Sequence, residues 1–149
     1  MHKTVPLILL PDFSEAACDA VVTSLAILLP EAVLLPMHMG NMSLADYEHS
    51  LRGLANNPPG QLILTLSSVD PTDFVSEATR RVCQKLFPGF GTLIRQAALP
   101  TNPAALLWDN TAGLCGQTLI VNLPSDANVI RTSLPLLFPA IPNAIRLAS

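Results

Sequence analysis

Gln61-Leu62-Ile63-Leu64-Thr65-Leu66 is a short apolar run that directly follows a turn-forming segment, Asn56 to Gly60. A continuous apolar run of this length is typical of a strand buried on both faces. Two similar runs precede it, Val5 to Leu10 and Ala32 to Leu35, and a segment with helical spacing separates each run from the next. This alternation predicts an α/β fold, a three-layer α/β/α sandwich with a mostly parallel sheet.

The two helices upstream of the central run begin at recognisable capping residues. Ser14 can cap a helix that starts at Glu15 and is stopped by Pro30. Ser43-Leu44-Ala45-Asp46 has the spacing of a capping box, with Asp in place of Glu or Gln, and predicts a helix through about Ala55. Ligands of such folds bind beyond the carboxyl ends of the strands. The loops after the strands are therefore where a site is expected.

Downstream of the central run the spacing predicts further strands and helices. We expect a helix from about Glu77 to Leu86, capped by Ser76, and a second helix from Pro88-Gly89-Phe90-Gly91 to Ala97. Gly89 and Gly91 are expected to hold a tight turn near the sheet through positive φ. The remaining expected elements are a strand at Ala104 to Leu107, a strand at Gln117 to Asn122 joined to it through Thr111-Ala112-Gly113, and a last helix from about Ala127 to Phe138. Nothing indicates an internal repeat or a second domain, so residues 1–149 are predicted to form one domain.

Composition limits the class of partner. Charged residues make up 13% of the chain, against about 25% in an average soluble domain. We therefore expect another subunit to cover part of the surface. A net charge of −3 with eight Lys and Arg residues supplies no basic patch, which argues against nucleic acid. A small molecule or another protein is the better prediction.

Neither a membrane segment nor a metal site is predicted from the sequence. No apolar run approaches the roughly 20 residues that span a bilayer. The stretch Pro6 to Pro11 is too short for the core of a signal peptide, which predicts a cytoplasmic protein.

Cys18, Cys83 and Cys115 form no C-x-x-C pair and are expected to be buried small hydrophobes. His38, Asp46 and His49 fit no metal motif and are expected to be polar surface residues.

Four segments resemble the molybdopterin adenylyltransferase family, which includes bacterial enzymes and the N-terminal domain of gephyrin. They occur in the family's order without a gap after Asp73. Asp73 with Ser76 to Arg80 resembles D-V-T-P-E-A-T, Pro88 to Gly91 repeats P-G-F-G, Gly116 to Pro124 resembles G-K-T-L-I-V-N-L-P, and Leu137 to Ile145 resembles L-P-A-L-P-H-A-I. The first 60 residues match in pattern, and Asp12 stands where the family has the Asp of a V-S-D turn.

The resemblance implies a molybdopterin-binding-domain-like fold, molybdopterin as the ligand, and a homo-oligomer that is a trimer or a multiple of one. It also implies a partner in the molybdenum-cofactor pathway. Asp73 matches the family's acid before the helix and is the candidate catalytic residue. The candidate cofactor-binding residues are Asp12, Ser67, Ser68, Asn122, Pro124 and Ser125.

The chain departs from the family where anions are bound. The family's G-G-T-G loop, whose bare backbone amides approach anionic oxygens, is replaced by Ser67-Ser68-Val69-Asp70. Asp70 is expected to add a negative charge where the ligand phosphate would sit. The family uses two carboxylates to bind magnesium and the nucleotide phosphates, and Asp73 matches one of them. The position of the second carboxylate falls near Asn41 or Met42, and neither of these side chains is an acid. L-S-R has become Leu107-Trp108-Asp109, and the glycine of N-L-P-G is Ser125. These losses predict weak binding of Mg-ATP.

Three hypotheses about function follow. The first is an altered or non-catalytic relative, a pseudoenzyme that still binds molybdopterin. The second is an active adenylyltransferase with a pocket rearranged around Asp12, Asp73 and Asn122. The third is an oligomeric assembly or chaperone subunit for a molybdoenzyme that binds no small ligand. Simpler structural roles remain for single residues. Asp73 can be a helix N-terminal carboxylate, Ser67 and Ser68 can satisfy turn amides, and Trp108 can be a core or interface anchor.

Overall fold

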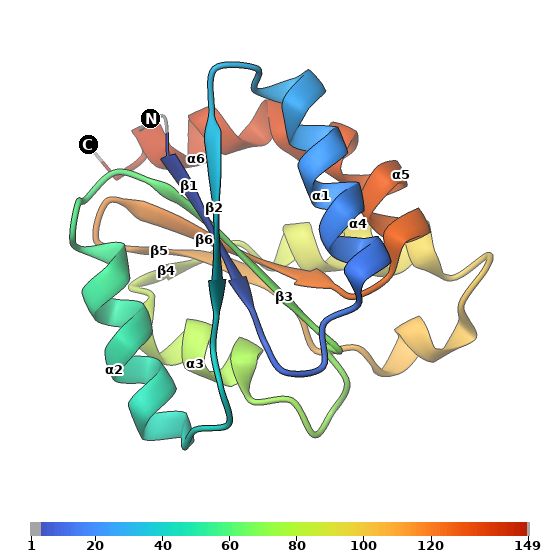
Figure 1. Cartoon of the computed structure of the whole chain (residues 1–149), viewed down its shortest axis with the longest axis horizontal. Coiled ribbons are helices and arrows are strands. Elements are labelled where there is room, and N and C mark those ends of the chain that lie inside the picture. Colours follow the sequence, from blue (N-terminus) through green and yellow to red (C-terminus); the bar gives the residue numbers. More distant parts are fainter. Residues whose placement is uncertain (1–3, 149) are drawn as a thin grey trace.

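A six-stranded sheet forms the centre of the computed structural model, which describes residues 4–148 (Figure 1). Its strand order is β2-β1-β3-β6-β5-β4. The first four strands in that order run parallel, and β5 lies antiparallel to both β6 and β4. The strands are β1 (Thr4–Leu9), β2 (Val33–His38), β3 (Leu62–Ser67), β4 (Lys85–Leu86), β5 (Ala112–Cys115) and β6 (Thr118–Pro124). The predicted α/β fold with a mostly parallel sheet is confirmed.

Helices lie on both faces of the sheet, which gives the predicted three layers (Figure 1). The helices are α1 (Glu15–Leu28), α2 (Leu44–Ala55), α3 (Val75–Val82), α4 (Pro88–Ala98), α5 (Ala127–Leu137) and α6 (Ile141–Arg146), with short 3-10 turns η1 (Pro103–Leu107) and η2 (Phe138–Ala140). None of the helices between residues 4 and 148 combines the length and apolar character that crossing a membrane requires.

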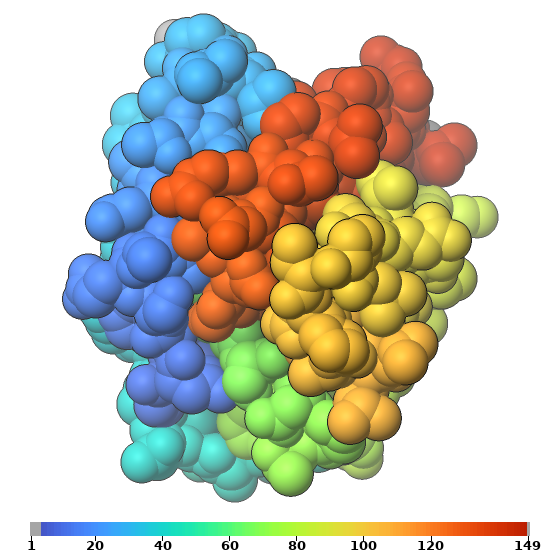
Figure 2. Space-filling model, turned by 90° about the vertical axis from the view of Figure 1, so that its right-hand side faces the viewer, coloured from blue at the N-terminus to red at the C-terminus, as the bar shows by residue number. Residues whose placement is uncertain are grey.

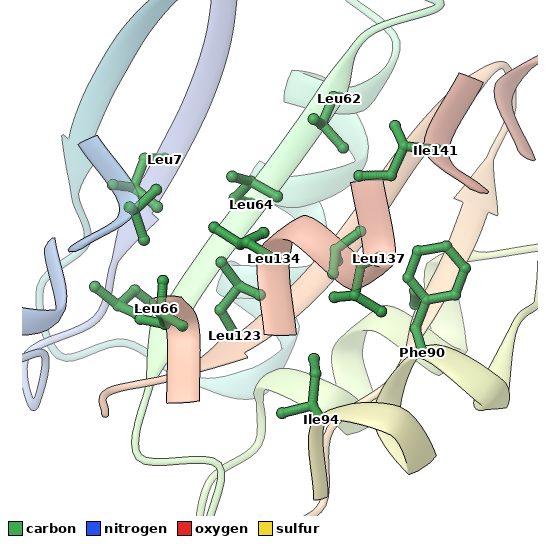
Figure 3. Close-up of a cluster of buried hydrophobic side chains, with 14 of the residues drawn as sticks. Leu7, Leu62, Leu64, Leu66, Phe90, Ile94, Leu123, Leu134, Leu137 and Ile141 are labelled. Atoms are coloured by element: carbon green, nitrogen blue, oxygen red, sulfur yellow. The ribbon is translucent and has the colours of Figure 1, made fainter. Parts of the chain in front are cut away.

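One face of the sheet packs against α1, α4, α5 and α6. Alternate residues of the central strands point to this side, among them Leu64 and Leu123, and they contact Leu134, Leu137 and Ile141 of the C-terminal helices (Figure 3). From outside, the same layer shows α1 in blue, α5 in orange-red and α4 with the segment after it in yellow to light orange, packed side by side (Figure 2). This face holds the larger apolar cluster.

The other face packs against α2 and α3 alone. Ile8, Ile63 and Ile120 point to this side and meet Tyr47 and Leu51 of α2. Burying both faces removes water from the inner strands, which is why β1, β3 and β6 are apolar at most positions. Because β1, β2 and β3 run parallel, the loops that connect them to the helices after them lie at the same edge of the sheet.

Several predicted elements differ from the structure. Ala104 to Leu107 is not a strand, because Pro103 and the side chain of Asn102, which accepts a hydrogen bond from the Ala104 amide, start the 3-10 turn η1. The expected connection Thr111-Ala112-Gly113 lies largely within strand β5. Helix α6, which follows the predicted last helix, was not expected.

Helix α3 also begins and ends earlier than predicted. Asp73 Oδ1 accepts a hydrogen bond from the Val75 amide, so the first turn forms before Ser76. The Ser76 hydroxyl donates instead to the Asp109 carbonyl. Cys83 is extended, and the residues after it enter β4 rather than the helix.

Candidate functional site

A cleft of about 310 Å³ lies at the carboxyl edge of the parallel strands. Three loops form it: Leu10 to Asp12 after β1, Gly40 to Met42 after β2, and Ser68 with Thr72 to Phe74 after β3. The chain passes from β1 to β2 on one side and then to β3 on the other side of β1, so the strand order reverses between β1 and β3. This reversal separates the loops and is the usual place for a ligand in an open α/β sheet.

The loop after β3 is held by carboxylates from two different segments. The Ser68 amide donates to Asp12 Oδ2 at 3.3 Å, and the Val69 amide donates to Asp73 Oδ2 at 3.0 Å. Val69 is fully buried and has a φ of 50°, in the left-handed region that a β-branched residue rarely adopts. The two consecutive amides that a ligand could have used therefore already bind carboxylates of the chain itself.

Asp73 stands at the junction of this loop and helix α3. Its Oδ1 accepts from the Val75 amide at 2.9 Å, while its Oδ2 accepts from Val69. A carboxylate at the first turn of a helix is also favoured by the positive end of the helix dipole. Asp73 is half-buried and lines the cleft. Each of its carboxylate oxygens accepts a backbone hydrogen bond, and the side chain is still accessible to a ligand.

Within residues 4–148, the charged side chains that line the cleft are all acidic. Asp12 and Asp73 are its charged lining residues, and no Lys, Arg or His is among the described residues that line it. Asn41 and Met42 do line the cleft, at the position where the family has its second acid. Asp70, expected to face a ligand phosphate, instead turns back to accept from the Thr72 amide at 2.8 Å. The Thr72 hydroxyl donates to the same oxygen, and the hydrogen bonds from this hydroxyl and from the Thr72 amide outweigh the effect of burial and hold the pKa of Asp70 below its ordinary value.

The nearby arginines are bound elsewhere. Arg80 on α3 forms a bidentate pair with Asp109, with N···O distances of 2.8 and 2.9 Å. The hydrogen bonds from Arg80 lower the pKa of the Asp109 carboxyl below its ordinary value. Arg81 pairs with Glu77 and Glu48. The Asp109 that stands in place of the family's arginine thus also engages the guanidinium of Arg80.

Four of the predicted cofactor-binding residues lie near the cleft without lining it. Asn122 is fully buried: its Nδ2 donates to Thr65 and Thr79 Oγ1 at 3.0 Å each, and its Oδ1 accepts from the Thr111 amide. Pro124 is buried on β6 opposite Ser67. The Ser67 carbonyl accepts from the Ser125 amide at 2.8 Å, and both serine hydroxyls are buried without a hydrogen-bond partner among the described residues. Asp12, Ser68 and Asp73 are the predicted site residues that the cleft brings together.

Some cleft residues were not predicted. Phe74 lines the cleft and stacks on Tyr47, with ring centroids 5.3 Å apart and an interplanar angle of 20°. Burial, with a smaller contribution from the charge of Asp73, raises the pKa of the Tyr47 hydroxyl, which has no hydrogen-bond partner among the described residues. An aromatic directly after the candidate catalytic Asp was the available signal for Phe74.

The histidines considered as metal ligands do not line the cleft. His38 makes an edge contact with Phe13, with ring centroids 5.4 Å apart, and His49 is exposed on α2. Within residues 4–148, no group of three His, Cys, Asp or Glu side chains is arranged to hold a metal ion. Cys115 is buried as expected, and Cys18 and Cys83 are partly buried.

Comparison with known proteins identifies relatives of both the sequence and the fold. No protein-family model matches the chain. A molybdopterin adenylyltransferase of Helicobacter pylori is 37% identical over 125 residues, which cover 80% of this chain and 71% of that protein. The Mog protein of Mycobacterium ulcerans has a TM-score of 0.80 at 23% identity, covering 99% of this chain and 100% of that one.

A second solved structure, the MoaB molybdopterin biosynthesis enzyme of Thermus thermophilus, has a TM-score of 0.79 at 27% identity and covers 99% of this chain and 96% of that one. The agreement extends through the first 60 residues, where the sequence resembles the family in pattern alone. Sequence identity and shared fold together show that the chain belongs to the MoaB/Mog family of molybdenum cofactor biosynthesis proteins.

Proposed function

We propose that this chain binds molybdopterin and does not transfer an adenylyl group to it at a rate useful to a cell. The observation that carries this proposal is the charge of the cleft, whose described lining residues include two carboxylates and no basic side chain. Relatives named for their action on molybdopterin support molybdopterin as the ligand. Those relatives are named as adenylyltransferases, and our proposal is that this chain keeps the binding of molybdopterin and lacks the transfer step.

The chemistry of adenylyl transfer explains why this charge matters. A nucleoside triphosphate and a phosphorylated pterin bring several negative charges together, and a transferase offsets them with backbone amides, a metal ion and basic side chains. Here the amides of Ser68 and Val69 bind carboxylates, and Arg80 is paired with Asp109. Both oxygens of Asp73 accept backbone hydrogen bonds, and Asn41 and Met42 stand where the second acid would be, so the residues present are a poor fit to Mg-ATP.

Active adenylyl transfer is the second candidate function. It is favoured by the retention of Asp73 at the cleft and by the name of the Helicobacter relative. In this case Asp73 would act as the catalytic carboxylate, with Asp12 beside it. The third candidate, an assembly subunit for a molybdoenzyme, is favoured by large apolar side chains on the surface, such as Leu106 at 74% exposed.

Two measurements separate these candidates. The first is pyrophosphate release from Mg-ATP in the presence of authentic molybdopterin, comparing wild type with Asp73→Asn. The second is molybdopterin binding by calorimetry. We expect binding without turnover. Robust turnover that Asp73→Asn abolishes would establish the transferase and overturn the proposal, and the absence of any binding would favour the assembly subunit. Complementation of a strain lacking its adenylyltransferase tests the transferase candidate in cells.

A further inference from the structure

The loop after β3 has the geometry of an anion site, with the anions supplied by the protein. Successive backbone N–H groups in a turn that includes a left-handed residue can form a concave anion-binding nest. The Ser68 and Val69 amides are consecutive, and Val69 has the left-handed φ. Asp12 from the loop after β1 and Asp73 from the start of α3 place one carboxylate oxygen on each amide.

Asp12 is the more exchangeable of the two carboxylates. It is exposed, its bond to Ser68 is 3.3 Å long, and it belongs to a loop distant in sequence from its partner. Asp73 is half-buried and is also bonded to the first turn of α3. A ligand phosphate at this loop would have to displace Asp12 from Ser68 and then remain close to both negative charges. Among the described residues, no basic side chain lines the cleft to offset that repulsion.

The same arrangement suits a different kind of ligand group. Each carboxylate oxygen can accept two hydrogen bonds, and Asp12 Oδ1 has no partner among the described residues. Leu10, Met42 and Phe74 supply apolar walls beside these acceptors. A flat, uncharged ring with an amino group next to a ring N–H can donate two parallel hydrogen bonds to such a carboxylate while its faces contact the walls.

We propose that Asp12 is a specificity-determining residue that makes the cleft bind the uncharged, N–H-bearing ring of its ligand and exclude the phosphate end. The inference rests on the proposed function, because it assigns an orientation to a pterin ligand. The aminopyrimidinone edge of the pterin faces Asp12, and the phosphate points out of the cleft. Asp12 thus fills the anion nest and presents an acceptor to the ring at the same time.

Two probes test the two halves of this proposal. The first is pterin itself, 2-amino-4-oxopteridine without a side chain or phosphate, followed by its fluorescence. The second is inorganic phosphate, followed by the NMR shifts of the Ser68 and Val69 amides. We expect wild type to bind pterin and to leave both amides unshifted by phosphate. Asp12→Ala should weaken pterin binding about tenfold and allow phosphate to shift the Ser68 amide, while the Val69 amide stays bound to Asp73.

Asp19→Ala is the matched control, since Asp19 is exposed on α1 and its loss changes the net charge equally. It should behave as wild type with both probes. Phosphate shifts of equal size in wild type and Asp12→Ala, or full pterin affinity in Asp12→Ala, would overturn the proposal. If authentic molybdopterin binds but pterin does not, this orientation is wrong and the proposed function stands. If neither binds, the proposed function falls as well.

Discussion

Gly91 shows how a residue can be required for a reason that its sequence does not reveal. The P-G-F-G segment predicts a tight turn whose glycines use positive φ. Within residues 4–148, however, the glycines with positive φ are Gly60 and Gly116. Gly91 lies in the first turns of α4, where an added Cβ would stand 2.1 Å from the Asn110 carbonyl oxygen. The requirement is close packing of the helix on the chain before β5.

We predict that Gly91→Ala lowers the free energy of unfolding by about 3 kcal/mol, because backbone atoms must separate to admit the methyl group. Gly89→Ala is the control, since an added Cβ at Gly89 meets nothing within 4 Å. It should be neutral or stabilising by about 0.5 kcal/mol, through helix propensity. Chemical denaturation of both variants gives the comparison. Equal stability of the two variants would show that α4 and Asn110 are not packed this closely.

Val69 provides a second test at single-residue scale. Its left-handed φ costs about 1 kcal/mol or more for a residue with a Cβ. Alanine and glycine both lack the two buried methyl groups of valine. The difference in stability between Val69→Ala and Val69→Gly therefore reports mainly the cost of a left-handed φ for a residue with a Cβ. We predict that Val69→Gly is more stable than Val69→Ala by about 1 kcal/mol, the reverse of the usual order. The usual order, with alanine more stable in urea, would mean that Val69 has an ordinary φ.

At the scale of elements, the bond between Arg80 of α3 and Asp109 before β5 predicts a dependence on pH. Because the folded-state pKa of Asp109 is depressed below its ordinary value of 3.8, the pair contributes stability above that pH. This contribution is lost as the pH falls through the folded-state pKa. Both side chains are partly exposed, at 41% and 44%, so the effect is a few tenths of a kcal/mol.

The measurement is urea unfolding of wild type and Asp109→Asn at several pH values. We predict that wild type is the more stable protein at pH 6 and that the difference closes below the ordinary pKa of the carboxyl. Asp19→Asn, which removes a carboxylate from an exposed position of α1, controls for the general effect of acid on net charge. A difference that stays constant from neutral to acidic pH would show that the pair contributes nothing through ionisation.

Sequence patterns predicted some elements closely and missed others for physical reasons. Helix α2 matched because its cap is local: Ser43 accepts from the Asp46 amide three residues later. Strand β5 was missed because its requirement is not local. Gly113 lies so close to a neighbouring strand that an added Cβ would stand 2.7 Å from the Lys85 carbonyl oxygen. The glycine that suggested a loop is there because β4 approaches it.

The candidate site shows the same limit. Asp12, Ser68 and Asp73 could be found because each follows a strand or precedes a helix, and loops at one edge of a parallel sheet meet. The direction of a side chain could not be predicted. Asn122 was expected to bind the ligand, yet it satisfies three hydrogen bonds inside the protein. The bonds from the loop amides to Asp12 and Asp73 depend on how the loop after β3 folds and on its position against the loop after β1, which no local pattern encodes.

For the whole molecule, the remaining prediction is that the protein is a trimer or a multiple of one. The chain has few charges, and large apolar side chains remain on its surface, including Ile27 at 80%, Val33 at 62% and Leu107 at 66% exposed. Single exposed apolar side chains are normal on a monomer, but together with the low charge content they support a surface that another chain covers. They lie on α1, on edge strand β2 and on η1.

Light scattering at micromolar concentration should give three times the chain mass of 15.9 kDa, about 48 kDa, or a multiple of that value. Substitutions can then identify the face that is covered. Val33→Lys and Leu107→Lys change exposed residues on different elements, the edge strand β2 and the turn η1, and leave the core intact, so a variant that is folded but monomeric marks the interface. A monomeric wild type would remove the trimer and, with it, the main support for an assembly subunit.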